Sequence, residues 1–191
     1  MTGTVAGVDA APTTSLRPSL TTPAVIVVVA LVVDQLSKWW ALDELEDGSV
    51  IEVLPTLEFD LHYNTGFSFG TGTGMGRWIA ILVVVLCLVL VHQIRVSETA
   101  LRANLAAVVL GGALGNLADR LLRAEDGPLS GAVIDFIDVT WYAVFNVADI
   151  LVVCGCIAFG VHELVMARRL DAALKAADLG ADEEPEEEPA T

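Results

Sequence analysis

The sequence has few of the residues that commonly build metal centres and nucleophilic sites. It has three histidines and three cysteines, Cys87, Cys154 and Cys156, and no spacing typical of a disulfide framework or a metal site. No HExxH segment is present, and no histidine suited to act as a base accompanies Ser68 or Ser130. We therefore expect no metal and no cofactor, and neither a metallopeptidase nor a serine hydrolase.

Positive charge is also scarce. Lys and Arg total 10 against 25 Asp and Glu, which gives a formal net charge of −15. Such a chain is a poor ligand for nucleic acid, so we expect no nucleic-acid partner. Eight of the acids lie in residues 171–191 beside one lysine, a block typical of a solvated, disordered end. We expect residues 169–191 to form an acidic, disordered cytoplasmic tail.

Residues 1–22 are rich in Thr, Ala, Pro and Ser, and we expect a flexible cytoplasmic N-terminus. A secretory signal peptide is the alternative, because Arg17 precedes an apolar run. That run is too long for a typical signal peptide, and no small-x-small cleavage pattern follows it.

Apolar residues, in contrast, are abundant: 54% of the chain is hydrophobic, and the mean hydropathy is +0.64. About 20 consecutive apolar residues are enough to cross a bilayer. Four runs are long enough to do so. We predict an all-α, multi-pass membrane protein with one membrane domain over residues 23–168 and transmembrane helices at about 23–42, 77–94, 103–122 and 145–166.

Between the first and second predicted helices, the pattern of apolar and polar residues changes. Apolar and polar residues alternate over residues 57–64, which is typical of a half-buried strand. Residues 50–54 could pair with this strand, with Pro55 near the turn, and the glycine-rich run 64–76 suits a bend back to the membrane. We predict a small extracytoplasmic β-sheet at about residues 49–74.

The cations predict the orientation in the membrane. The region 43–73 contains acids and no Lys or Arg, whereas both chain ends and one helix connection carry cations. By the positive-inside rule, both termini lie in the cytoplasm. Arg120 and Arg123 run against the rule, which a site role for Arg120 would explain. The flanking cations are Arg17, Arg95, Arg102, Arg168, Arg169 and Lys175.

Charged and amide side chains interrupt the apolar segments, where they are costly and usually mark a site. Asp34 and Lys38 are four residues apart, which favours an ion pair on one helical face. In the predicted topology, the polar groups all fall near the outer leaflet. They are Asp34 and Lys38 in the first helix, Asn116, Asp119 and Arg120 in the third, Asp135 after it, and Asn146 and Asp149 at the start of the fourth.

Carboxylates are the most abundant reactive groups in this set. When two are held together, one keeps a proton and the other can activate water, which indicates aspartic hydrolysis without a cofactor. The amides and the arginine could orient the pair or bind developing charge.

A small transporter or ion-coupled channel is the alternative, because buried Asp, Asn and Arg suit it equally well. The lack of an internal repeat and the clustering at one leaflet, rather than at the midplane, argue against it. A purely structural assembly factor would leave the carboxylates unexplained.

Five segments, in order, resemble the motifs of the signal peptidase II (lipoprotein signal peptidase) family. They are DQLSK (34–38), NTGFSFG (64–70), GGALGNLADR (111–120), GAVIDF (131–136) and FNVADI (145–150). The resemblance implies a four-helix aspartic peptidase of the bacterial cytoplasmic membrane with an outer β-cradle. Its partners would be membrane lipid and diacylglyceryl-modified prolipoproteins, cut just before the lipid-carrying Cys, and we expect it to act as a monomer.

The resemblance also implies residue roles. Asp135 and Asp149 would form the catalytic dyad, with Asp119 as the main alternative for one position; we rank Asp119 as a supporting carboxylate that fixes Arg120 or the helix end. Two departures are Ser68, where the family usually has Ala, and a longer loop over 121–132. The residues that would bind substrate or support the dyad are Asn64, Gly66, Asn116, Arg120, Asn146, Ala148, Asp34 and Lys38.

Overall fold

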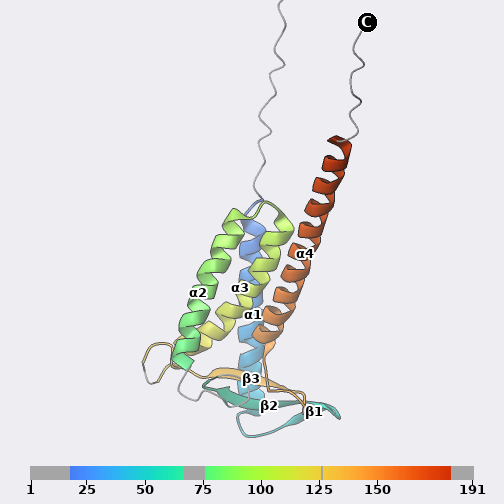
Figure 1. Cartoon of the computed structure of the whole chain (residues 1–191). Coiled ribbons are helices and arrows are strands. Elements are labelled where there is room, and N and C mark those ends of the chain that lie inside the picture. The colour runs from blue at the N-terminus through green and yellow to red at the C-terminus, as the bar shows by residue number, and fades with distance from the viewer. Residues whose placement is uncertain (1–17, 67–75, 126, 182–191) are drawn as a thin grey trace, which may run out of the picture.

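The computed structural model describes residues 18–66, 76–125 and 127–181. Its elements, in chain order, are α1 (Thr21–Leu45), β1 (Ile51–Leu54), β2 (Leu57–Asn64), α2 (Gly76–Val96), α3 (Ala100–Leu122), β3 (Val133–Asp138) and α4 (Val147–Ala181). The helices lie side by side, and the sheet crosses one end of the bundle (Figure 1). The predicted fold, four apolar helices and a small sheet, is confirmed. Ser68 and residues 1–17 of the expected flexible segment 1–22 lie outside the described residues. Helix α1 begins at Thr21, so the prediction of a flexible segment is wrong for residues 21–22.

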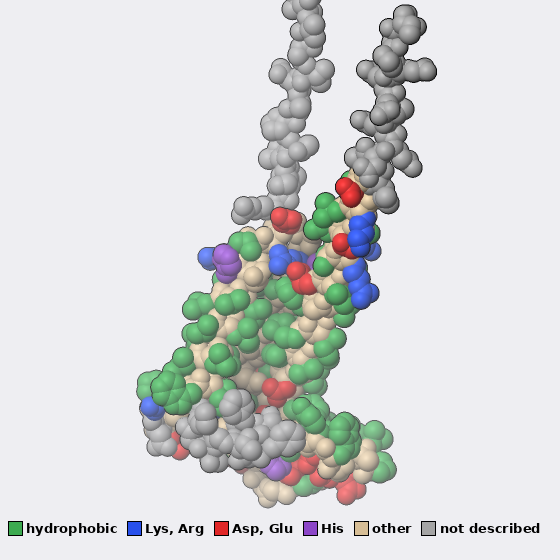
Figure 2. Space-filling model, viewed as in Figure 1, with side chains coloured by type: hydrophobic (Ala, Val, Ile, Leu, Met, Phe, Trp, Pro, Cys, Tyr) green, Lys and Arg blue, Asp and Glu red, His purple; other side chains and the backbone are tan. Residues whose placement is uncertain are grey.

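The lateral surface of the bundle is apolar. Hydrophobic side chains cover the visible faces of the helices (Figure 2), and Val29, Leu82 and Val153 are 54%, 64% and 55% exposed. Within the described ranges, four helices are long and apolar enough to cross a membrane. The 25 residues of α1 span about 38 Å, more than the roughly 30 Å of bilayer hydrocarbon. The chain is a multi-pass membrane protein.

Helix α3 is the centre of the bundle and packs against α1, α2 and α4. Two adjacent glycines allow the close approaches. A Cβ atom on Gly111 would lie 2.5 Å from Ala30 Cβ in α1, and one on Gly112 would lie 2.6 Å from the carbonyl oxygen of Ala148 in α4. Small residues at such positions let membrane helices pack closely.

The sheet has a third strand that the sequence analysis did not predict. The strand order is β1-β2-β3, and both strand pairs are antiparallel. The strand β3 comes from the connection between α3 and α4, and it pairs with the hairpin that connects α1 to α2 in the chain. Residues 133–136 are all buried, and a strand buried on both faces has no period-two signal. In the pairing of β2 with β3, His62 lies opposite Asp135 and Asn64 lies opposite Val133.

The C-terminal end of α1 packs against this sheet. The buried residues of that contact are Ala41, Leu45, Ile134 and Phe136. The ring of Trp40 lies 5.2 Å from that of Phe59 and 6.0 Å from that of Phe136, both edge to face. Because Leu45 is only 1% exposed in this contact, α1 continues to Leu45 rather than ending near residue 42.

Helix α4 is longer than predicted. It ends at Ala181 rather than near residue 166, so the expected disordered tail from residue 169 is wrong for residues 169–181. This segment consists largely of Ala and Leu, which favour helix, and Lys175 Nζ lies 2.9 Å from Asp171 Oδ2 one turn earlier. The 35 residues span about 52 Å, so α4 projects beyond the other helices (Figure 1).

The contact between α1 and α3 predicts that Gly111→Ala destabilises the protein. The added methyl overlaps Ala30 Cβ, and separating the helices should cost about 1–3 kcal/mol. Thermal unfolding in detergent measures the effect. Gly160→Ala in α4 is the matched control, because no atom lies within 4 Å of its added methyl. Equal melting temperatures for the two variants would contradict the predicted close packing.

Candidate active site

The N-terminus of α4 positions Asp149. The Asp149 amide donates to Asn146 Oδ1 (3.0 Å), and the Asn146 amide donates to Asp149 Oδ2 (3.2 Å). This reciprocal pair is a capping box, with an aspartate in the place of the usual glutamate. The Ala148 amide donates to Asp34 Oδ1 in α1 (2.9 Å), a favourable place for an anion. The segment FNVADI therefore fixes Asp149 at a helix end.

Asp135 lies in β3 and is 3% exposed. Its Oδ1 accepts from Asn146 Nδ2 (2.6 Å), and its Oδ2 accepts from Asn64 Nδ2 (2.9 Å). Asn64 ends β2, and its Oδ1 accepts from the Gly66 amide (3.0 Å), which also makes it a turn residue. Asn146 hydrogen-bonds to Asp135 and to Asp149, so the two carboxylates lie beside the same residue.

Asn116 in α3 hydrogen-bonds both to Asp149 and to Lys38 of α1. Its Nδ2 donates to Asp149 Oδ1 (2.8 Å). Its Oδ1 accepts from Asn146 Nδ2 (3.0 Å) and from Lys38 Nζ (2.9 Å). Both lone pairs of Oδ1 are thereby used.

Lys38 lies between two buried carboxylates. Its Nζ is 2.9 Å from Asp34 Oδ2 and 2.8 Å from Asp119 Oδ2, and these three side chains are at most 1% exposed. The predicted Asp34–Lys38 ion pair is present. Asp119 also accepts from the Ile134 amide (3.3 Å) and lies 3.4 Å from Arg123 Nε. Asp119 thus joins Lys38 to β3 and contacts Arg123, the C-cap residue of α3, at the helix end that was one of its two expected partners.

Arg120 connects the two loops that flank the site. Its Nη2 donates to the Gly66 carbonyl (3.0 Å), and its Nη1 donates to the Gly131 carbonyl (3.4 Å). Gly76, the first residue of α2, has no room for a side chain, because a Cβ there would lie 2.7 Å from Arg120 Nη1. The Arg120 side chain therefore lines the site and also holds the backbone of the two loops beside it.

A cavity of about 150 Å³ opens where these residues meet. Six of its ten lining residues are predicted site residues: Asn64, Gly66, Asn116, Arg120, Asp135 and Asp149. Asp34, Lys38, Asp119, Asn146 and Ala148 do not line it and instead support those that do. The apolar lining residues were not predicted from the sequence; they are Ile79, Val83, Leu117 and Val133. Nothing in the uniformly apolar sequence of α2 distinguishes Ile79 and Val83 from their neighbours.

Burial raises the pKa of Asp135 to about 6, and the nearby charge of Asp149 adds to this rise. The hydrogen bonds from Asn64 and Asn146 and the charge of Lys38 act in the opposite direction. A carboxyl with a pKa in this range can hold or release a proton near neutral pH, as acid–base catalysis needs.

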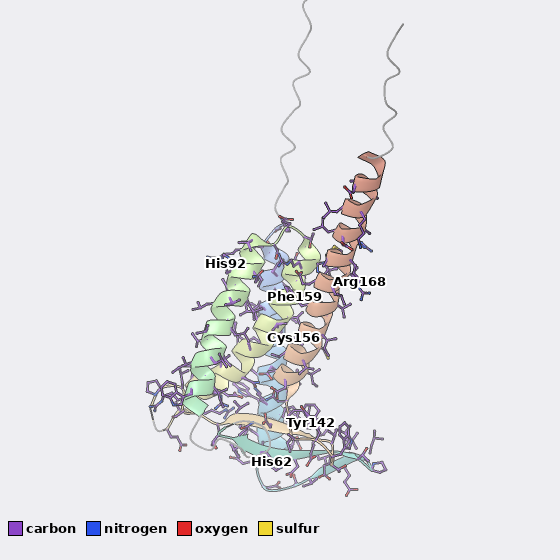
Figure 3. All side chains as sticks on the ribbon, viewed as in Figure 1. His62, His92, Tyr142, Cys156, Phe159 and Arg168 are labelled. Carbon is purple, nitrogen blue, oxygen red and sulfur yellow. The ribbon has the colours of Figure 1, made fainter. Side chains whose placement is uncertain are left out.

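Within the described part of the chain, one group of side chains outside the cavity could hold a metal ion. The ligand atoms of Asp60, His62 and Asp138 lie within 4.8 Å of one another, and His62 Nε2 is 2.9 Å from Asp60 Oδ2. His62 lies on the sheet, at the end of the molecule opposite His92 (Figure 3). None of the three lines the cavity that holds Asp135 and Asp149.

The fold and the site together define a class of protein. Two carboxylates, the buried Asp135 and the half-buried Asp149, lie on the wall of a cavity inside a bundle of membrane-spanning helices, and Asn146 donates a hydrogen bond to each. In the part of the chain that the structure describes, no serine or cysteine lines this cavity. The protein is a membrane-embedded hydrolase of the aspartic peptidase class.

Comparison with known proteins identifies the family. The family profile described as Signal peptidase (SPase) II matches residues 26–165. A lipoprotein signal peptidase of Bifidobacterium longum is 42% identical over 145 residues, covering 74% of this chain and 78% of the relative. One from Rhodococcus jostii is 40% identical over 146 residues, covering 74% and 71%. The chain belongs to the signal peptidase II family.

Two solved bacterial membrane enzymes have the same fold. One, determined at 1.9 Å by the in meso method, is 26% identical, with a TM-score of 0.67 over 78% of this chain and 96% of its own. The other, determined at 2.3 Å by the same method, is 23% identical, with a TM-score of 0.64 over 92% and 98%.

The hydrogen bond from Asn64 predicts the direction of a pH effect. This bond favours the ionised form of Asp135, so Asn64→Ala should raise the pKa of Asp135 further above about 6. In a plot of kcat/KM against pH, the limb that reflects the titration of Asp135 should move to higher pH by roughly half a unit to one unit. Tyr63→Phe, at an exposed neighbour in β2, is the control. A limb that stays in place for Asn64→Ala would show that this bond does not act on the titrating group.

Proposed function

We propose that this protein removes the signal peptide from diacylglyceryl-modified prolipoproteins by cutting just before the lipid-carrying Cys, with Asp135 and Asp149 as the catalytic dyad. The observation that carries the proposal is the pair of hydrogen bonds from Asn146, one to each carboxylate, at the wall of the cavity. Membership of the signal peptidase II family supports the substrate class.

The reaction needs one proton on the pair. The ionised carboxylate takes a proton from a water molecule, and the water oxygen bonds to the scissile carbonyl carbon. The protonated carboxyl gives its proton to the carbonyl oxygen, which forms a neutral tetrahedral diol. The C–N bond then breaks, the nitrogen takes a proton from the first carboxyl, and a diol proton returns to the second.

The two asparagines orient the dyad in this proposal. Asn116 Nδ2 donates to Asp149, and Asn146 Nδ2 donates to Asp135 and to Asn116 Oδ1. These donors are engaged with the carboxylates and with each other, so they support positioning rather than binding of the substrate carbonyl. Arg120 holds the Gly66 and Gly131 carbonyls and thereby shapes the cavity.

The signal peptide would reach the dyad from the lipid. Ile79 and Val83 of α2 and Leu117 of α3 form an apolar part of the lining of the cavity that the carboxylates of β3 and α4 also line. α2 and α4 both pack on α3. A signal helix entering between α2 and α4 would keep its acyl chains in the bilayer while its cleavage site meets the dyad. The residues of the dyad and its support all come from one chain, which supports a working monomer.

The orientation we propose places both termini in the cytoplasm and the active site near the outer leaflet. Arg95, Arg102 and Arg168 lie near the end of the bundle away from the sheet, and β1 and β2 have no Lys or Arg. The visible surface of the sheet end is rich in acidic side chains (Figure 2). The positive-inside rule places the cationic end in the cytoplasm.

The dyad assignment predicts that Asp135→Asn and Asp149→Asn are folded but inactive. Asparagine keeps the side-chain shape and removes acid–base function, so cleavage should fall at least about 1,000-fold. Asp119→Asn should keep measurable activity, because Asp119 supports Lys38 and β3 without lining the cavity. The measurement is cleavage of a diacylglyceryl-modified prolipoprotein by purified protein in detergent.

Asp138→Asn is the matched control for loss of one acid from β3, and we expect it to cut normally. If Asp119→Asn were inactive and Asp135→Asn active, the dyad would be Asp119 and Asp149. Activity in all three variants would reject aspartic catalysis at this site and favour a transporter.

The orientation predicts which introduced cysteines a membrane-impermeant maleimide labels in intact cells. Glu52→Cys in β1 should react, and Lys175→Cys in α4 should react only after the membrane is opened. Both variants are made in a chain whose three native cysteines are replaced by alanine. The reverse labelling pattern would invert the proposed topology.

A further inference from the structure

We infer that Lys38 is a positioning residue for the dyad: it holds the Asn116 amide in the one orientation that donates to Asp149. The inference rests on the proposed function, because it takes Asp135 and Asp149 as the catalytic pair. It gives this buried cation a role in the reaction beyond neutralising Asp34.

The contacts of the Lys38 ammonium are complete. It has three N–H donors, and three acceptors surround it: Asp34 Oδ2 (2.9 Å), Asp119 Oδ2 (2.8 Å) and Asn116 Oδ1 (2.9 Å). Its side chain is 0% exposed, and it does not line the cavity. Lys38 therefore has no donor left for a substrate, and any effect on the reaction passes through its neighbours.

The chemistry of the ammonium fixes the direction of the Asn116 amide. An ammonium only donates, so the oxygen of the amide must face Lys38, and its NH₂ group then faces Asp149. A flipped amide would place two donors against each other at Lys38 and an oxygen against the Asp149 carboxylate. Without Lys38, the bond from Asn146 Nδ2 would be the remaining one to Asn116 Oδ1.

The positive charge of Lys38 also supports the dyad, because it favours the ionised form of Asp135. The acids around the site are Asp34 in α1, Asp119 in α3, Asp135 in β3 and Asp149 in α4, and the facing cations are Lys38, Arg120 and Arg123. Burial raises the pKa of Asp135, and Lys38 limits the rise. Loss of this cation should make the dyad hold its proton more tightly.

The test compares Lys38→Met with Arg123→Gln. Methionine keeps an unbranched side chain but removes the charge and all three donors. We expect kcat to fall roughly 10-fold, with KM within about twofold, and the Asp135 limb to move up by about one pH unit. Arg123→Gln also removes a cation from Asp119, but Arg123 is not among the hydrogen-bond partners of Asn116. In that variant, the part of the pH–rate profile that reports the titration of Asp135 should therefore stay at the wild-type pH.

Lys38→Met removes the cation beside the buried Asp34 and leaves Asp119 with Arg123 alone, a loss that is expected to destabilise the fold strongly. The double variant Lys38→Met/Asp119→Asn removes one cation and one anion together and decides the matter if the single variant does not fold. We expect kcat to remain reduced in the double variant, because Asn116 still lacks its donor. Recovery of wild-type kcat would overturn the inference, since Lys38 would then serve only to neutralise Asp119.

The outcomes separate this inference from the proposed function. Cleavage by Asp135→Asn and Asp149→Asn would reject the dyad whatever Lys38 does. If those variants are inactive while a folded Lys38→Met protein keeps wild-type kcat and pH profile, only the role of Lys38 is wrong.

Discussion

The constraint on which the rest of the structure depends is the burial of charge inside a membrane-spanning bundle. Lys38, Asp34 and Asp119 are at most 1% exposed, and an isolated ion at such a place costs several kcal/mol. The structure meets this constraint with close contacts from four elements. Asp34 accepts the α4 amide of Ala148, and Asp119 accepts the β3 amide of Ile134. The same contacts that satisfy the charges therefore fix α4 and β3, the elements that carry Asp149 and Asp135.

The sheet is needed in this enzyme because it holds Asp135 at the active site. Asp135 lies outside the helices, and its position depends on the pairing of β3 with β2 and on the packing of Phe136 against Trp40 of α1. Asn64, at the end of β2, then reaches Asp135 directly. The sheet thus holds one carboxylate of the pair, and the capped end of α4 holds the other.

Much of this could be predicted from the sequence, because polar residues stand out in apolar segments. The helices and the pairing of β1 with β2 follow from hydropathy and from period-two alternation, and Asn116, Arg120, Asp135 and Asp149 stand out as polar residues in apolar segments. Asn64 and Gly66 were expected at the site only from the resemblance to the motifs of the signal peptidase II family. Strand β3 could not be predicted, since its burial on both faces removes the alternation. Ile79 and Val83 were also missed, because an apolar side chain that lines a cavity looks in sequence like one that faces lipid. The helix beyond residue 168 was missed because its acids resembled those of the tail that follows.

The central claim is that Asp135 and Asp149 act together on one scissile bond. The most direct measurement is a structure of the protein with a lipidated signal peptide in which the scissile amide is replaced by a hydroxyethylene group. That group resembles the tetrahedral intermediate and cannot be cut. The account predicts its hydroxyl within about 3.2 Å of a carboxylate oxygen of each residue. A hydroxyl that contacts neither carboxylate, or that lies against Asp119, would contradict the account.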